Sequence, residues 1–261
     1  MSLKKTNYHT HTQFCDGKNT AEEMVLCAIE RNFDELGFSS HSFVPFDMGY
    51  AMNEEDYPLY KAEIERLKKK YKDKIKILCG IELDYFSSAP KESFDYVIGS
   101  VHYVYKNGEY VSLDRTAAEI ADGADRLYGG DIYALVEGYY SLLGNVVDKT
   151  CADIVGHFDI LTKFHEQTPL FDTEHPRYVA AWKAAADKLI TKNVIFEINT
   201  GAIARGRRTF PYPNEDILLY LAKRGARFCI NSDCHYAEKI DFWFDEAREL
   251  AEKYSLKIVT L

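Results

Sequence analysis

Apolar residues along the chain follow two different spacings. Short apolar runs rich in β-branched and aromatic residues alternate with longer segments in which apolar residues recur three and four positions apart. The short runs predict strands at residues 5–9, 34–40, 75–83, 96–101, 153–156, 194–198 and 228–231, with a last one near 258–259. Strand, loop and helix repeat about seven times, and this alternation predicts a parallel α/β arrangement.

The segments between the strands have helical periodicity. Thr20 to Glu23 has the pattern of a capping box, in which each of the two side chains accepts a hydrogen bond from the other residue's backbone N–H. Further helices are predicted at residues 60–71, 116–127, 132–148, 174–191, 214–224 and 242–253, whereas 201–213 is predicted to be a basic loop. Asn107-Gly108 favours a two-residue turn, so a small hairpin should project from the end of the fourth strand.

A polar residue stands at the end of each of the seven main predicted strands. These residues are His9, His41, Glu82, His102, His157, Asn199 and Asp233. In a (βα) barrel the carboxyl ends of the strands converge on one rim, where active sites are built. A layered sheet would not bring seven successive strand ends together. The positions therefore favour a TIM-like barrel with its site at the C-terminal rim.

Composition limits the classes of protein that fit. The 261 residues are 46% hydrophobic, which suits one well-cored domain spanning residues 1–261. The net charge of −9 argues against nucleic acid or an anionic membrane as partner. The six cysteines form no CxxC pair, no apolar run is long enough to span a bilayer, and the first residues lack the apolar core of a signal peptide. These features predict a cytoplasmic protein and leave its oligomeric state unknown.

Histidines and carboxylates supply the candidate metal ligands. His9 and His11 lie two residues apart on an extended segment and therefore project to the same side. The full set is His9, His11, Asp16, His41, Glu82, His102, His157, Asp233 and His235. So many nitrogen and oxygen donors suit two or three divalent ions of the zinc, manganese or iron type, with Glu82 able to bridge two of them. Asp16 could instead be a turn residue before Gly17, and His157 a packed imidazole.

Two basic residues lie shortly after predicted strand ends. Arg205 follows the strand that ends at Asn199, and Lys163 follows the strand that ends at His157. A guanidinium on the rim could bind two phosphate oxygens at once, and Lys163 is a second candidate for the same anion. The alternative is that Arg205, Arg207 and Arg208 form a solvated surface cluster.

The ordered set of motifs resembles that of the polymerase and histidinol phosphatase (PHP) superfamily, over essentially the whole chain. The resemblance rests on His9-x-His11, Asp16-Gly17, His41, Glu82, His102, His157 and Asp233-x-His235. It implies a distorted seven-stranded (βα) barrel with a trinuclear metal centre. One ion would be held by His9, His11, Glu82 and Asp233, a second by Glu82, His102 and His157, and a third by Asp16, His41 and His235. Some members have a histidine where this chain has Asp16.

Two further segments refine the resemblance. Gly156-His-Phe-Asp-Ile160, and Glu197-Ile-Asn-Thr-Gly201 followed by Arg205, are similar to the free-standing histidinol-phosphate phosphatases of the superfamily. This similarity implies hydrolysis of L-histidinol phosphate to L-histidinol and phosphate, a step of histidine biosynthesis. A metal-activated hydroxide would attack phosphorus at a site formed by Glu82 and Asp233, and Arg205 would steady the phosphate.

Three questions about function stay open from the sequence. The substrate could be another small phosphate monoester or a nucleotide, and the barrel could be a metal-storing or regulatory module without turnover. For the leaving group of L-histidinol phosphate, Phe43, Phe46 and Tyr50 offer aromatic walls and Asp47 a partner for the ammonium group. An ordinary packed loop is the alternative for these four residues.

Overall fold

The computed structural model describes residues 4–47, 49–89 and 93–261. Within these ranges the centre of the molecule is an eight-stranded sheet in the order β1-β2-β3-β4-β7-β8-β9-β10. All neighbouring strands in it pair in parallel. The strands are β1 (Thr6–Asn7), β2 (Glu35–Phe38), β3 (Lys76–Asp84), β4 (Tyr96–Ser100), β7 (Ile154–Val155), β8 (Ile195–Asn199), β9 (Arg227–Asn231) and β10 (Lys257–Ile258). The first three residues, on which the expectation of no signal peptide partly rests, lie outside the described residues.

The sheet curls until the segment after β1 meets the segment after β9. Thr10 forms a parallel bridge with Cys234, and the N–H of His11 donates to the carbonyl of Cys234 at 3.0 Å. The short strand β10 lies beside the start of β9 and adds an eighth member to the seven main strands. The predicted distorted, TIM-like parallel barrel is therefore confirmed.

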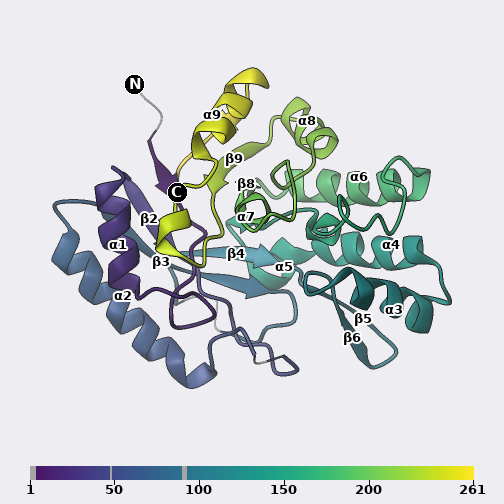
Figure 1. The fold of residues 1–261 in the computed structure, drawn as a ribbon, viewed down its shortest axis with the longest axis horizontal. Coiled ribbons are helices and arrows are strands. Elements are labelled where there is room, and N and C mark those ends of the chain that lie inside the picture. The colour runs from purple at the N-terminus through teal and green to yellow at the C-terminus, as the bar shows by residue number, and fades with distance from the viewer. Residues whose placement is uncertain (1–3, 48, 90–92) are drawn as a thin grey trace.

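Helices surround the strands, with α1 and α2 on one side and α4 and α6 on the opposite side (Figure 1). Their bounds are α1 (Ala21–Glu30), α2 (Tyr57–Tyr71), α3 (Ala117–Tyr128), α4 (Ile132–Leu143), α5 (Val146–Thr150), α6 (Pro176–Ile190), α7 (Gly201–Ala204), α8 (Glu215–Lys223) and α9 (Phe244–Lys253), with 3₁₀ turns η1 (Glu54–Asp56), η2 (Ile160–Thr162) and η3 (Ala237–Lys239). None of the helices in the described ranges is long and apolar enough to cross a membrane.

Local signals explain where several elements begin and end. The capping box of α1 is present, because Thr20 Oγ1 accepts from the N–H of Glu23 and the Glu23 carboxylate accepts from the N–H of Thr20. The single helix predicted at 132–148 is wrong, since the chain breaks at Gly144 and Asn145 into α4 and α5. The segment predicted as a loop at 201–213 opens with the single turn α7.

The buried ring of Tyr96, the first residue of β4, fills the lower interior of the barrel, which is the part away from the rim. The Tyr96 hydroxyl crosses from β4 to donate to the backbone carbonyls of Tyr8 and Phe38. Gly37 and Gly80 make room for its ring, because a Cβ at either position would come within 2.4 Å and 2.3 Å of Tyr96. Strand side chains alternate between the two faces of the sheet. The inward-facing residues that come later along the same strands therefore lie between Tyr96 and the rim. The Tyr96 ring therefore lies beneath the polar site and closes the barrel below it.

Candidate metal centre

Glu82, near the end of β3, lies among five imidazoles, and its side chain is completely buried. Its Oε1 is 2.9 Å from His157 Nε2 and 3.3 Å from His102 Nε2. Its Oε2 is 2.8 Å from His41 Nδ1, 3.2 Å from His9 Nε2 and 3.6 Å from His11 Nε2. One carboxylate therefore contacts side chains that come from the ends of β1, β2, β4 and β7.

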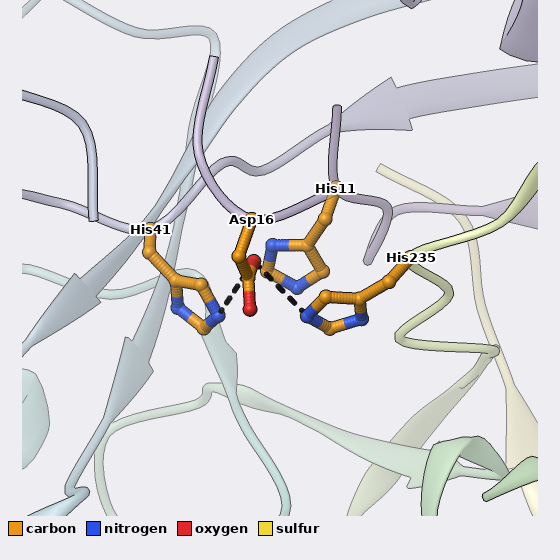
Figure 2. Close-up of side chains that lie close together, drawn as sticks. All are labelled: His11, Asp16, His41 and His235. Atoms are coloured by element: carbon orange, nitrogen blue, oxygen red, sulfur yellow. Dashed lines mark ion pairs between the residues drawn. The ribbon is translucent and has the colours of Figure 1, made fainter. Parts of the chain in front are cut away.

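Asp16 lies in a second part of the cluster, with His11, His41 and His235 (Figure 2). Its Oδ1 is 3.2 Å from His235 Nε2 and 3.8 Å from His41 Nε2. The following Gly17 permits this arrangement, because a Cβ there would lie 2.4 Å from the backbone nitrogen of Thr12. The turn that Gly17 allows thus directs the Asp16 carboxylate into the cluster.

Asp233 connects the cluster to the basic segment after β8. Its Oδ1 is 3.2 Å from His11 Nε2 and 3.7 Å from His9 Nε2. Arg205 Nη2 donates to Asp233 Oδ2 and Arg205 Nη1 to the Asp233 carbonyl, both at 3.0 Å. All nine candidate ligands predicted from the sequence consequently lie in one connected group.

The donor atoms fall into three overlapping groups. Atoms within 4.8 Å of one another belong to His11, Asp16, His41 and His235, to His9, His11 and Asp233, and to His41, Glu82 and His102. His11 and His41 each take part in two groups. His9, His11 and Asp233 share a group, as do Asp16, His41 and His235, and the allocation of residues to individual ions that the resemblance implies stays a prediction.

Four buried polar atoms in the cluster form no hydrogen bond of normal geometry among the described residues. They are His9 Nε2, His11 Nε2, Asp16 Oδ1 and Glu82 Oε2. Buried polar groups in folded proteins are almost always paired, so four such atoms in one cluster need another partner. Imidazole nitrogens and carboxylate oxygens are ligands for zinc, manganese and iron, so the residues fit divalent ions.

The electrostatics differ among the histidines of the cluster. Burial alone would lower the pKa of His9, His41 and His102, but the carboxylates around them outweigh it and raise these pKa values, so a metal ion would displace their protons on binding. Burial, reinforced by His235 and His41, lowers the pKa of His11 to about 3, so this imidazole is neutral. Burial alone would raise the pKa of Glu82. The neighbouring His41, His9 and His102 outweigh that effect and hold the pKa well below its ordinary value.

Two carboxylates that the sequence analysis did not assign contact the histidines on the side of each ring that faces away from the cluster. Glu197 Oε2 lies 2.9 Å from His9 Nδ1, and Glu197 Oε1 accepts from the N–H of His157 at 2.6 Å. Asp84 Oδ2 lies 3.1 Å from His102 Nδ1 and accepts from the His102 N–H at the same distance. Both are two residues from a position already singled out, Asp84 from Glu82 and Glu197 from Asn199. The period of a strand could therefore have identified them.

Asn199 supports this arrangement and also donates from Nδ2 to Asp233 Oδ2 in the cluster, at 3.4 Å. Its Nδ2 donates to Glu197 Oε1 at 2.7 Å, and Asn231 Nδ2 donates to Glu197 Oε2 at 2.8 Å. The buried Glu197 carboxylate is thus fully hydrogen-bonded.

A cleft of about 380 Å³ opens above the cluster. Lys163 and Arg205, the two predicted phosphate-binding residues, both line it, and their side chains are 15% and 36% exposed. Lys163 Nζ donates to the backbone carbonyl of Asp114 at 2.8 Å. The cleft therefore has a metal-binding floor and a cationic wall.

The solvated-cluster alternative for the arginines is wrong at Arg208, which is 5% exposed. Its Nη1 lies 3.4 Å from Asp159 Oδ2 and donates to Thr162 Oγ1 at 2.8 Å. Arg207 is exposed and stacks over Phe164. Three nearby arginines thus have three different environments.

A parallel barrel with a histidine and carboxylate cluster at the carboxyl ends of its strands defines a candidate metal-dependent enzyme. The chain belongs to the PHP domain family, whose model matches residues 7–201. A probable histidinol-phosphatase of Deinococcus radiodurans is 28% identical over 254 residues, which cover 92% of this chain and 89% of the relative. The histidinol-phosphatase of Lactococcus lactis subsp. lactis is 28% identical over 280 residues, with 96% and 91% covered.

Solved structures have the same fold. A putative histidinol phosphatase of Listeria monocytogenes superposes with a TM-score of 0.82 at 23% identity and covers 93% of this chain and 99% of its own. The histidinol phosphate phosphatase of Lactococcus lactis, solved with zinc, L-histidinol and phosphate, gives 0.72 at 24% identity and covers 99% and 96%.

Proposed function

We propose that this protein is a metal-dependent phosphomonoesterase that hydrolyses L-histidinol phosphate to L-histidinol and phosphate. The observation that carries the reaction type is the pairing of a buried cluster around Glu82 with a cationic wall of Lys163 and Arg205 in one cleft. The substrate is supported by the relatives, which are named histidinol-phosphatases and match this chain along nearly its whole length.

We also propose two or three divalent ions of the zinc, manganese or iron type as cofactors. The proposed ligands are the nine residues predicted from the sequence, His9, His11, Asp16, His41, Glu82, His102, His157, Asp233 and His235. Bound ions would supply Lewis acidity that activates water and neutralises charge on the phosphoryl oxygens. Zinc is the ion named with the structure of the Lactococcus relative.

The remaining side chains have roles that follow from their contacts. Arg205 holds Asp233 with two nitrogens and leaves the rest of its guanidinium for phosphate oxygens. Lys163 adds a second positive charge on the same wall. The assignment of the whole chain to one domain and its cytoplasmic location remain predictions from the sequence.

Hydrolysis rates across a panel of small phosphate monoesters test the substrate. Purified, metal-loaded protein should prefer L-histidinol phosphate over an aryl phosphate and over nucleoside monophosphates by at least about 100-fold in kcat/KM, because a site built for two polar groups rejects substrates that lack them. Comparable rates would favour a general phosphoesterase. Faster turnover of a nucleotide would identify the nucleotide, in place of L-histidinol phosphate, as the substrate. No turnover of any ester would favour the regulatory alternative.

Metal counting tests the cofactor. Elemental analysis should find more than one equivalent of a transition metal per chain. Glu82→Gln should lose both metal and activity, because Glu82 contacts all the other proposed ligands except Asp16, Asp233 and His235. A variant with full activity and at most one bound ion would contradict the multinuclear centre.

A further inference from the structure

The wall of the cleft that adjoins Lys163 includes the base of the hairpin formed by β5 (Tyr103–Lys106) and β6 (Glu109–Ser112). The predicted turn at Asn107-Gly108 connects the two strands, with φ of 53° and 90°. Tyr103 pairs with Ser112, and the N–H of Leu113 donates to the His102 carbonyl at 2.9 Å. The hairpin thus leaves the rim next to His102 and returns to it, which brings Asp114 to the cleft.

Two carboxylates in this region, Asp47 and Asp114, differ in how completely they are paired. Asp47 Oδ2 accepts from the Tyr103 hydroxyl at 2.6 Å and also binds the Arg115 guanidinium, and its side chain is 16% exposed. Its negative charge is therefore already matched. Asp47, which the sequence analysis offered as the partner for an ammonium group, is therefore less available to a further cation than Asp114.

Asp114 keeps a carboxylate directed to the cleft. Its side chain is 33% exposed, and Ser112 Oγ donates to its Oδ1 at 3.2 Å. Lys163 Nζ lies 3.6 Å from its Oδ2, whereas the shorter contact of Lys163 is a hydrogen bond donated to the backbone carbonyl of Asp114. Burial alone would raise the pKa of Asp114, but the charge of Lys163 opposes this and the pKa is lowered, so the group is ionised.

We propose that Asp114 is a specificity-determining residue that binds the ammonium group of the substrate's leaving alcohol. The inference rests on the proposed function, and the substrate class it defines is the phosphate esters of amino alcohols. In L-histidinol phosphate the ammonium is carried by the second carbon from the ester oxygen. A phosphate held by Arg205 and Lys163 would therefore have the ammonium close by, and Asp114 is the carboxylate that contacts Lys163.

Two substrates that differ by one group test this assignment. L-Histidinol phosphate is compared with 3-(imidazol-4-yl)propyl phosphate, which lacks only the amino and hence the ammonium group. The ratio of their kcat/KM values is measured in the wild type, in Asp114→Asn and in the matched control Asp47→Asn. Asp114→Asn should reduce the ratio by at least about 30-fold, because a hydrogen bond between charged groups is lost for only one substrate. Asp47→Asn should leave the ratio unchanged.

A second pair of variants separates binding from folding. Asp114→Glu keeps the charge and should retain a preference for the amino substrate, whereas Asp114→Ser should behave as Asp114→Asn does. Metal content and melting temperature are recorded for each variant. Equal loss on both substrates would mean that Asp114 acts only through Lys163, and a changed ratio in Asp47→Asn alone would transfer the role to Asp47. Either result overturns the inference while leaving the phosphatase activity intact. A wild type that hydrolyses neither compound would overturn the proposed function itself.

Discussion

Glu197 Oε2 lies 2.9 Å from Nδ1 of His9, on the side of the imidazole away from the cluster. His9 Nε2, the other ring nitrogen, is one of the buried atoms that form no hydrogen bond with any residue that the structure describes. A carboxylate on Nδ1 favours the tautomer that carries its proton there, which leaves the Nε2 lone pair free for a metal ion. The same carboxylate accepts from the His157 backbone, so one buried group orients candidate ligands from two separate strands.

Glu197→Gln should therefore weaken metal binding. The amide is of similar size but carries no charge, and loss of such a partner typically lowers metal affinity by about 10–100-fold. Competition with a chromophoric chelator measures the change. Glu35→Gln is the matched control, because Glu35 is also a buried carboxylate but bonds to Tyr8 in the lower part of the barrel. Equal loss of affinity in both variants would point to general destabilisation.

Strand ends explain why so much of the site could be predicted from the sequence. Each of the candidate ligands His9, His41, Glu82, His102 and His157 lies in or within three residues of a parallel strand, at its carboxyl end. Parallel strands fix the direction in which every such residue faces, so chain order alone predicts that they converge. Local patterns such as the capping box at Thr20 and the turn at Gly108 were equally informative.

Environments that depend on distant segments could not be read from the sequence. Arg205, Arg207 and Arg208 are nearly consecutive, yet only Arg208 is buried, because its partner Asp159 comes from the loop after another strand. The pairing of Asp47 with Arg115 likewise depends on how the hairpin folds back. The break between α4 and α5 was missed because apolar periodicity continues across it.

Arg205→Ala should lower kcat/KM by about two to three orders of magnitude, since a contact to the phosphoryl group in a partly dry site contributes about 3–4 kcal/mol to transition-state stabilisation. Arg207→Ala is the control, because Arg207 is exposed and is on the same segment. Because Arg205 also donates to Asp233, a proposed ligand, both variants are assayed at saturating metal and their metal content is recorded, so that the loss reports on the phosphate contact. Small and equal effects of the two substitutions would argue against a phosphate contact by Arg205.

Arg208→Ala should affect stability first. The substitution leaves Asp159 buried beside an empty position, and breaking a buried ion pair in this way costs about 3–5 kcal/mol of unfolding free energy. Urea unfolding at constant metal concentration measures the loss, and Arg207→Ala should lie within about 0.5 kcal/mol of the wild type. A wild-type unfolding midpoint in Arg208→Ala would mean that the pair contributes nothing.

The last prediction concerns acid stability at a pair of contacts remote from the cleft. Asp241 Oδ2 accepts from Lys5 Nζ at 2.8 Å, and Arg31 pairs with the other carboxylate oxygen. Burial alone would raise the pKa of Asp241, but the hydrogen bonds from Lys5 and Arg31 outweigh it, and the pKa in the folded protein is lowered.

Because the folded-state pKa lies below the unfolded value of about 3.9, the pair stabilises the protein fully above that pH, and the contribution is lost as the pH falls through the folded-state pKa. The difference in urea midpoint between the wild type and Asp241→Asn should therefore be constant from neutral pH down to about 5 and shrink below about 4. Both proteins are measured with excess chelator, so that protonation of metal ligands affects them equally. A difference that stays constant to the lowest pH would mean that the Asp241 carboxylate has the same pKa in both states, and its contacts with Lys5 and Arg31 would then not favour the ionised form.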